Sequence, residues 1–157
     1  MSSLKAFGIE EGKGKFHEEA IYSLALVYNI ITDAITSYLI DYDLTPGKFN
    51  ILMAIKHQGR EEGIAQGEIS KHLIVTPSNM TKMIDKLEAA GLVRRSALEG
   101  DRRVNIMRVT AKGEKVLDSV WDGYNKKLKE LTEELTLNQQ KDLASLLNTW
   151  LNRLRGG

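Results

Sequence analysis

The chain has 157 residues and a formal net charge of +1 at pH 7, with 42% hydrophobic and 27% charged residues. This length and composition are typical of a globular protein with one domain or two small lobes, and they exclude disordered and fibrous classes. The sequence contains no cysteine, which excludes disulfides, zinc–thiolate sites and thiol redox sensing.

The N-terminal part of the chain predicts an arm followed by two helices. Residues 1–15 combine glycines with charged residues and show no periodicity, so we expect a flexible arm. From Phe16 to Leu39, apolar residues recur in steps of three and four, which predicts a helix with a wide apolar face. Thr45 and Pro46 then supply the N-cap and the first-turn proline of a second helix.

Nothing in this part predicts membrane insertion or export. Polar residues interrupt the apolar stretch 21–39, so we expect no helix that spans a bilayer. The first five residues lack the apolar core of a signal peptide. Both observations favour a cytoplasmic location.

The middle of the chain predicts two further helices. A short one at residues 66–73 lacks a capping side chain at its start. The next begins with Thr76 as its cap and Pro77 in its first turn, and ends at Gly91. Its inward positions, which recur at helical spacing, are Met80, Ile84 and Leu87.

A basic β-hairpin and two more helices complete the chain. Strands are expected at residues 92–97 and 102–109, joined by a turn at 99–101. Thr110 is expected to cap a long helix that runs to about Leu135. Either Thr136 together with Gln139, or Asn138, caps the last helix, which carries a leucine-rich stripe up to Leu154.

The order helix, turn, helix, hairpin predicts a mainly α protein with a winged helix-turn-helix and a small β-hairpin wing. The expected organisation is a flexible arm (1–15), a dimerisation helix (16–44), a DNA-binding winged helix-turn-helix (45–112) and C-terminal dimerisation helices (113–157). The apolar faces of the terminal helices are too wide for one small chain to cover, so we expect a homodimer. Its two-fold symmetry would present two reading helices to a palindromic DNA site.

Charge is distributed in a way that fits this prediction. Residues 68–112 contain nine Lys or Arg and five Asp or Glu, so this segment is net +4 while the rest of the chain is net −3. One cationic surface of this kind is expected where a protein meets phosphate. A solvated surface with dispersed charges could give the same count.

The candidate DNA-binding residues lie on the second of the two middle helices and on the wing. Near the helix N-terminus, a short polar side chain such as Asn79 can bond the edge of an adenine, and Arg102 at the wing turn can enter a minor groove. Asp101 is expected to pair with Arg103 and stabilise the wing. The full candidate set is Ser78, Asn79, Thr81, Lys82, Lys86, Arg94, Arg95, Arg102 and Arg103. The alternative is a capped amphipathic helix followed by a salt-bridged hairpin, with no ligand.

The sequence resembles the MarR family of bacterial winged-helix regulators. Residues 101–110 (DRRVNIMRVT) are similar to the family's wing pattern, Asp-x-Arg followed after five residues by Leu-Thr, with Val109 where Leu is usual. Residues 76–81 (TPSNMT) and 87–93 (LEAAGLV) resemble the family's recognition helix and its exit into the wing. The likeness extends from about Phe16 to Leu154. It implies a transcriptional regulator, expected to be a repressor, in a bacterial or archaeal cytoplasm.

The resemblance also implies a crevice for a small aromatic or phenolic effector between the dimer helices and the reading unit. Residues chosen as candidates by their type and helix location are His17, Tyr28, Tyr38, Phe49 and His57. Each of these residue types more often belongs to a core or an interface.

Other functions have weaker support. The three histidines lie on different predicted helices and no metal-binding motif is present, so we expect neither a metal nor a cofactor. A site built from Asp41, Asp43 and distant histidines remains open. No catalytic fingerprint occurs, so we do not expect an enzyme. The main rival is a winged helix that contacts another protein without specific DNA binding, because fold alone does not decide function.

Overall fold

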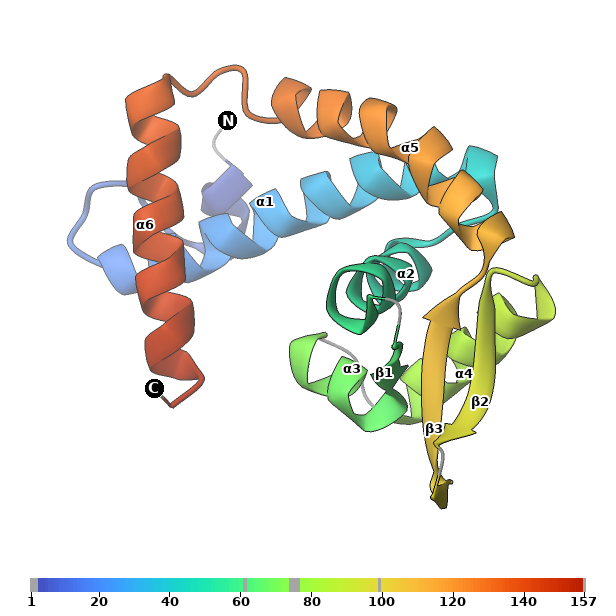
Figure 1. The fold of residues 1–157 in the computed structure, drawn as a ribbon. Coiled ribbons are helices and arrows are strands. Elements are labelled where there is room, and N and C mark those ends of the chain that lie inside the picture. The colour runs from blue at the N-terminus through green and yellow to red at the C-terminus, as the bar shows by residue number, and fades with distance from the viewer. Residues whose placement is uncertain (1–2, 61, 74–76, 99, 157) are drawn as a thin grey trace. The chain divides into compact units, whose positions relative to one another are not determined.

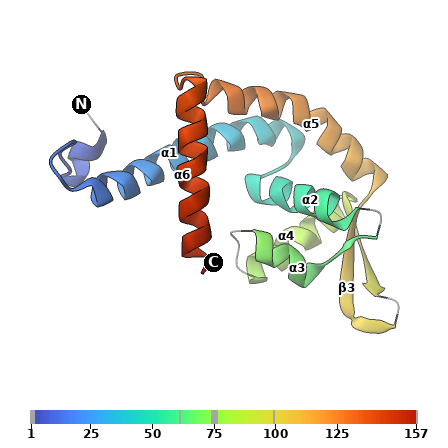
Figure 2. The same ribbon diagram turned by 60° about the vertical axis from the view of Figure 1, so that its left-hand side comes forward.

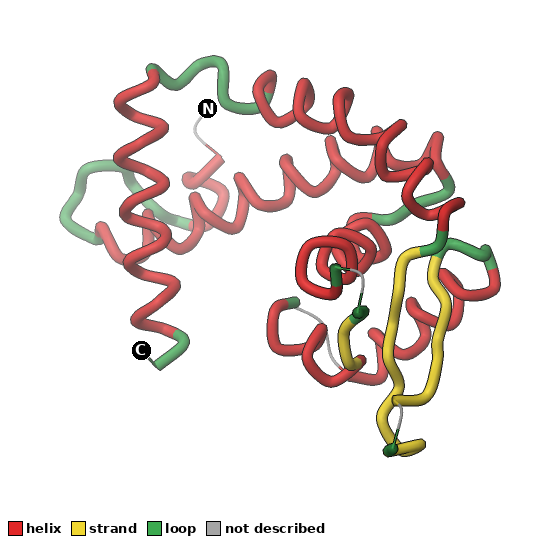
Figure 3. Tube along the Cα trace, viewed as in Figure 1, coloured by secondary structure: helices red, strands yellow, loops and turns green. Residues whose placement is uncertain are grey.

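The structure is a computed structural model that describes residues 3–60, 62–73, 77–98 and 100–156. It confirms the expected mainly α class with a small antiparallel sheet (Figures 1 and 3). The chain forms two compact units, Met1–Asp122 and Gly123–Gly157. Its elements in chain order are the 3-10 helix η1 (Ser3–Phe7), α1 (Phe16–Leu39), the 3-10 helix η2 (Ile40–Tyr42), α2 (Pro46–Gly59), β1 (Ile64–Ala65), α3 (Gln66–His72), α4 (Pro77–Ala89), β2 (Val93–Leu98), β3 (Asp101–Val109), α5 (Ala111–Glu130) and α6 (Leu137–Leu154).

Local capping signals place the starts of three helices. At α2, Thr45 Oγ1 accepts a hydrogen bond from the Lys48 amide at 3.3 Å. At α5, Thr110 Oγ1 accepts from the Gly113 amide at 3.0 Å. At α6, Thr136 and Gln139 form a complete capping box, so the alternative cap at Asn138 is wrong. The predicted cap of α4, Thr76, lies outside the described residues.

The sheet has the strand order β1-β3-β2, with both pairs antiparallel. The hairpin β2–β3 is confirmed, with Val93 paired to Val109. Strand β1 was not predicted, because two residues carry no pattern of their own; Ile64 pairs with Met107 on β3. Gly63 allows this approach: at φ +80° its backbone lies so close to β3 that a Cβ atom would lie 2.6 Å from Ile106 Cγ2.

The core of the first unit lies where α2, α3 and α4 pack beside the sheet (Figure 2). Phe49 and Ile69 are fully buried there, together with Met107 from β3. The three positions that the sequence assigns to the inward side of α4 are also buried, as predicted: Met80, Ile84 and Leu87. This burial fixes which side of α4 faces outward.

The start of α5 packs directly against the turn that follows α4. A Cβ atom at Gly113 would overlap the carbonyl oxygen of Leu92, so only glycine permits this approach. The Thr110 hydroxyl also donates to the Gly91 carbonyl at 2.6 Å. The exit from the hairpin is therefore fastened to the end of the reading helix.

Two segments differ from the sequence prediction. Within residues 1–15, η1 forms a turn and both Leu4 and Ile9 are buried, whereas no regular structure was expected. Helix α5 ends at Glu130 rather than near residue 135. The Thr132 hydroxyl donates to the Leu128 carbonyl, a local bond that competes with continued helix.

Helix α1 with η2, spanning Phe16–Tyr42, is long and apolar enough to cross a membrane by length and composition. The polar residues that interrupt this stretch are mostly uncharged and so do not lower its mean hydropathy enough to exclude it by composition. Only 11% of the most apolar window is buried. A single helix of this kind is weak evidence for a membrane, but its apolar surface needs some cover.

Candidate nucleic-acid interface

Helix α4 presents a polar, cationic surface opposite its buried side. Asn79, Thr81, Lys82 and Lys86 are all exposed, as the spacing predicted. Ser78 belongs to the same helix, but its side chain lies outside the described ones. The arrangement places short polar groups toward the N-terminal end of the helix and a lysine in its last turn.

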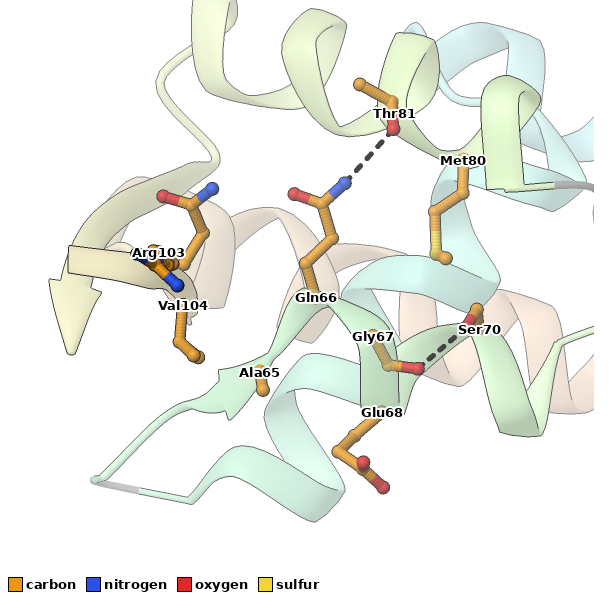
Figure 4. A pocket seen from close by; sticks show the side chains of 10 residues that line it. Ala65, Gln66, Gly67, Glu68, Ser70, Met80, Thr81, Arg103 and Val104 are labelled. Carbon is orange, nitrogen blue, oxygen red and sulfur yellow. Dashed lines mark hydrogen bonds between the residues drawn. The ribbon is translucent and has the colours of Figure 1, made fainter. Parts of the chain in front are cut away.

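A cavity of about 460 Å³ lies between this surface and the wing (Figure 4). Its lining comes from β1, α3, α4 and β3, and includes Gln66, Thr81, Arg103 and Asn105. Gln66 Nε2 donates to Thr81 Oγ1 at 3.1 Å, which fixes the position of a candidate DNA-binding hydroxyl. Gln66 and Asn105 were not predicted from the sequence, because neither carries a charge and neither follows the helical spacing that singled out α4.

Three arginines of the wing lie in three different environments. The Arg94 side chain is exposed, and among the described residues it forms no hydrogen bond or ion pair. Arg108 is half-buried and donates to Ser96 Oγ at 2.9 Å. Arg103 is exposed and lines the cavity. The side chains of Asp101 and Arg102 lie outside the described ones, so the predicted wing-stabilising pair remains a prediction.

Arg95 lies in a setting that the sequence did not predict. Its Nη2 lies 2.6 Å from an oxygen of Asp85, and its Nε lies 3.8 Å from an oxygen of Glu88. Its backbone amide donates to the other oxygen of Glu88 at 3.1 Å. The guanidinium therefore pairs with two acids of α4.

The five candidate effector residues occupy different environments in the structure. Phe49 is only 2% exposed and belongs to the core, whereas Tyr28 is 62% exposed on α1. His17 lies exposed near the start of α1. The Tyr38 hydroxyl donates to the Val120 carbonyl at 2.8 Å. Among the described residues, His57 is the one candidate that lines the cavity between α2 and α5.

That cavity has a volume of about 300 Å³. Its lining residues are Met53, Lys56, His57, Leu117, Asp118, Trp121 and Asp122. Lys56 Nζ lies 2.6 Å from Glu114 and 3.3 Å from Asp118, which joins α2 to α5. The hydrogen bond to Glu114 is the main cause that raises the pKa of Lys56. The lining thus has two carboxylates, those of Asp118 and Asp122, and one lysine.

No group of three or more His, Asp or Glu side chains in the described part of the chain is arranged to hold a metal ion. The alternative metal site at Asp41 and Asp43 therefore gains no support from these residues.

Comparison with known proteins gives a consistent result. The MarR family model matches residues 44–104. PecS of Dickeya dadantii, an HTH-type transcriptional regulator, is 27% identical over 127 residues, covering 81% of this chain and 76% of PecS. MhqR of Bacillus subtilis, another such regulator, is 26% identical over 124 residues, covering 79% of this chain and 83% of MhqR.

Solved structures agree with the curated relatives. A mutant MarR from E. coli complexed with operator DNA superposes with a TM-score of 0.77 at 25% identity, covering 83% of this chain and 91% of that one. Sco3205 of Streptomyces coelicolor, at 21% identity and a TM-score of 0.81, shares the fold over 90% of this chain and 89% of its own. The relatives and the fold are those of transcription regulators and not of enzymes. Residues 44–104 match the MarR family model, and the relatives and the fold together support a winged-helix transcriptional regulator of that family.

Proposed function

We propose that this regulator binds double-stranded DNA as a homodimer at a pseudo-palindromic operator, represses nearby genes, and is released by a small-molecule effector. The observation that best supports DNA binding is that α4 has a buried apolar side and an exposed polar, cationic side. Met80, Ile84 and Leu87 anchor it in the core while its polar, cationic surface faces outward beside a wing rich in arginine. Solved MarR-family structures in complex with DNA support the same function.

In this proposal α4 enters the major groove and the wing lies over the adjacent minor groove. Asn79 reads a base edge, and Thr81 is held in place by Gln66. Lysines and arginines contact phosphates and set the register. The proposed contact residues are Ser78, Asn79, Thr81, Lys82, Lys86, Arg94, Arg102 and Arg103. Half-site centres are expected about one helical turn, or a small multiple of it, apart.

Dimerisation is supported by the uncovered apolar surface of α1. Val27 is 50% exposed and Ile30 is 63% exposed, and α6 contains no buried residue. A second copy would cover these surfaces and present two reading helices at once. A lipid bilayer could also cover α1, but the relatives are transcription regulators, so we favour the second copy and a cytoplasmic location.

We place the effector in the cavity between α2 and α5. Trp121 and Met53 offer apolar surface, while Asp118 and Asp122 contribute two carboxylates against the single lysine, Lys56. This lining favours a small aromatic compound that is neutral or positively charged over a phenolic acid, because a carboxylate ligand would face repulsion. Binding would release DNA only if the ligand favours one separation of the reading helices.

The proposal is tested by measuring binding to duplexes selected from the source genome, by fluorescence anisotropy at several salt concentrations. About six neutralised phosphates per dimer predict a log–log salt slope near −5. Asn79→Ala should relax preference at one base pair at a cost of about 1–3 kcal/mol, whereas Arg102→Ala should weaken binding to all duplexes and reduce the slope. In the effector arm, aromatic amines should displace the duplex at lower concentrations than phenolic acids of similar size.

Equal affinity for selected and random duplexes would contradict sequence-specific recognition. A protein that ignores duplex DNA even in dilute buffer, and passes unretained through a heparin column, would instead support the winged helix as a protein-interaction module. If phenolic acids displace the duplex and amines do not, DNA binding stands and the proposed effector class is wrong.

A further inference from the structure

Arg95 is a cationic residue of the wing that forms ion pairs with acids of α4, and its geometry distinguishes it from Arg94. The two are neighbours on β2 and face opposite sides of the strand. Arg94 is exposed, whereas the Arg95 side chain is 27% exposed. Arg95 is thus more covered than its acidic partners, Asp85 at 54% and Glu88 at 40%.

Three contacts connect this one residue to α4. Nη2 donates to Asp85 at 2.6 Å, the backbone amide donates to Glu88 at 3.1 Å, and Nε lies 3.8 Å from Glu88. The Nε atom is buried, and within the described residues it has no hydrogen-bond partner. A phosphate that approached this guanidinium would meet the carboxylates of Asp85 and Glu88 beside it and would compete with a short, charge-assisted hydrogen bond.

We propose that Arg95 is a positioning residue that fastens wing strand β2 to reading helix α4 and neutralises Asp85 and Glu88, instead of contacting DNA. The inference rests on the proposed DNA-binding function and assigns Arg95 a role different from the direct contact expected from its sequence position. It depends on one arrangement, in which Arg95 of β2 contacts both Asp85 and Glu88 of α4.

The position of Asp85 explains why this neutralisation matters. Asp85 is exposed on α4, three residues after Lys82 and next to Lys86. Without Arg95, its carboxylate would repel phosphate or pair with Lys82 at i, i+3 spacing. With Arg95 in place, both lysines stay available to DNA. The same bond fixes the angle between the helix and the wing, which must fit two grooves at once.

The test compares Arg95→Gln, Asp85→Asn and the double variant on an operator duplex, with salt slopes for each. Arg95→Gln should weaken operator binding about tenfold, a loss within the range of coupled charge pairs, and should reduce the magnitude of the slope, because the freed Asp85 carboxylate offsets Lys82. Adding Asp85→Asn should recover most of the affinity and restore the slope, because the unpaired carboxylate is gone. Arg95→Lys should fall between wild type and Arg95→Gln, because it keeps the charge and loses the planar fork.

Arg94→Gln is the matched control, since it removes the same charge one residue away. It should reduce the magnitude of the slope by about 1, as expected for a phosphate contact, and Asp85→Asn should not rescue it. Thermal melts monitored by circular dichroism confirm that every variant is folded at the assay temperature.

Two results would overturn the proposal. One is a reduced slope for Arg95→Gln without rescue by Asp85→Asn, which would indicate direct contact with DNA. The other is unchanged binding by Arg95→Gln while the wild type binds the operator. If the wild type itself fails to bind duplex DNA, the proposed function fails instead.

Discussion

At the scale of single residues, Tyr38 shows how a side chain chosen for a ligand site can instead join two helices. Its hydroxyl donates to the Val120 carbonyl at 2.8 Å and lies 3.2 Å from the Tyr42 hydroxyl. The bond ties the end of α1 to α5. Burial, as the main cause, raises the pKa of Tyr38 to about 12. The neutral phenol therefore contributes to stability.

Tyr38→Phe should lower the free energy of unfolding by about 1 kcal/mol, the usual contribution of one such hydrogen bond. Because the folded-state pKa lies above the ordinary value of 10.0, the wild type keeps this contribution below pH 10 and loses it as pH rises toward 12. Urea unfolding at pH 7.5 and across that alkaline range measures both effects. The phenylalanine variant should lose less stability at high pH.

Tyr42→Phe serves as the comparison, since the Tyr42 hydroxyl lies 3.5 Å from the Ser119 carbonyl and leaves the Tyr38 bond to Val120 intact. It should cost less than Tyr38→Phe. An equal or larger loss for Tyr42→Phe would show that the connection between α1 and α5 does not depend on Tyr38.

At the scale of elements, the sequence predicted what local chemistry decides. The starts of α2 and α6 follow from caps whose partners lie three residues away, Thr45 with Lys48 and Thr136 with Gln139. The turn at η1 and strand β1 depend on packing with distant segments, so neither was predicted. The end of α5 depends on a local competing bond that the apolar spacing does not reveal.

The candidate site shows the same difference between features that local sequence decides and features that depend on the fold. Helical spacing separated the exposed Lys82 from the buried Ile84, and the structure confirms that assignment. Counting arginines on the wing could not separate Arg94 from Arg95, because the acid that pairs with Arg95 lies ten residues earlier on another element. Gln66 shows a further limit, since only the fold brings it to Thr81.

The junction between α4 and α5 depends on one glycine. Gly113→Ala should destabilise the first unit by about 1–3 kcal/mol, the cost of overpacking a close contact, because its Cβ would overlap the Leu92 carbonyl oxygen. Thermal unfolding measures the loss. Gly67→Ala is the control on another helix, where the added Cβ meets nothing within 4 Å. Equal melting temperatures for the two variants would contradict the close approach.

At the scale of the whole molecule, one chain leaves an apolar surface that a stable protein in water would cover. Most of the exposed apolar residues of α1 form a stripe along one side of the helix: Ile21, Leu24, Val27, Tyr28, Ile30 and Ile31. A second copy could cover this stripe, because in a two-fold symmetric dimer the same surface of each copy packs against the other. A palindromic operator would then be read by two helices whose separation depends on this interface.

Val27→Glu should therefore break the dimer. Burial of a valine contributes about 1.5 kcal/mol or more, and symmetry repeats the loss in both copies, so the dimer dissociation constant should rise at least about 100-fold. Light scattering coupled to size exclusion measures the change. Asn29→Glu adds the same charge about 200° around the helix and should leave the dimer intact. If Val27→Glu stays dimeric, α1 is not the interface; if the wild type co-sediments with lipid vesicles and the variant does not, a bilayer covers this helix.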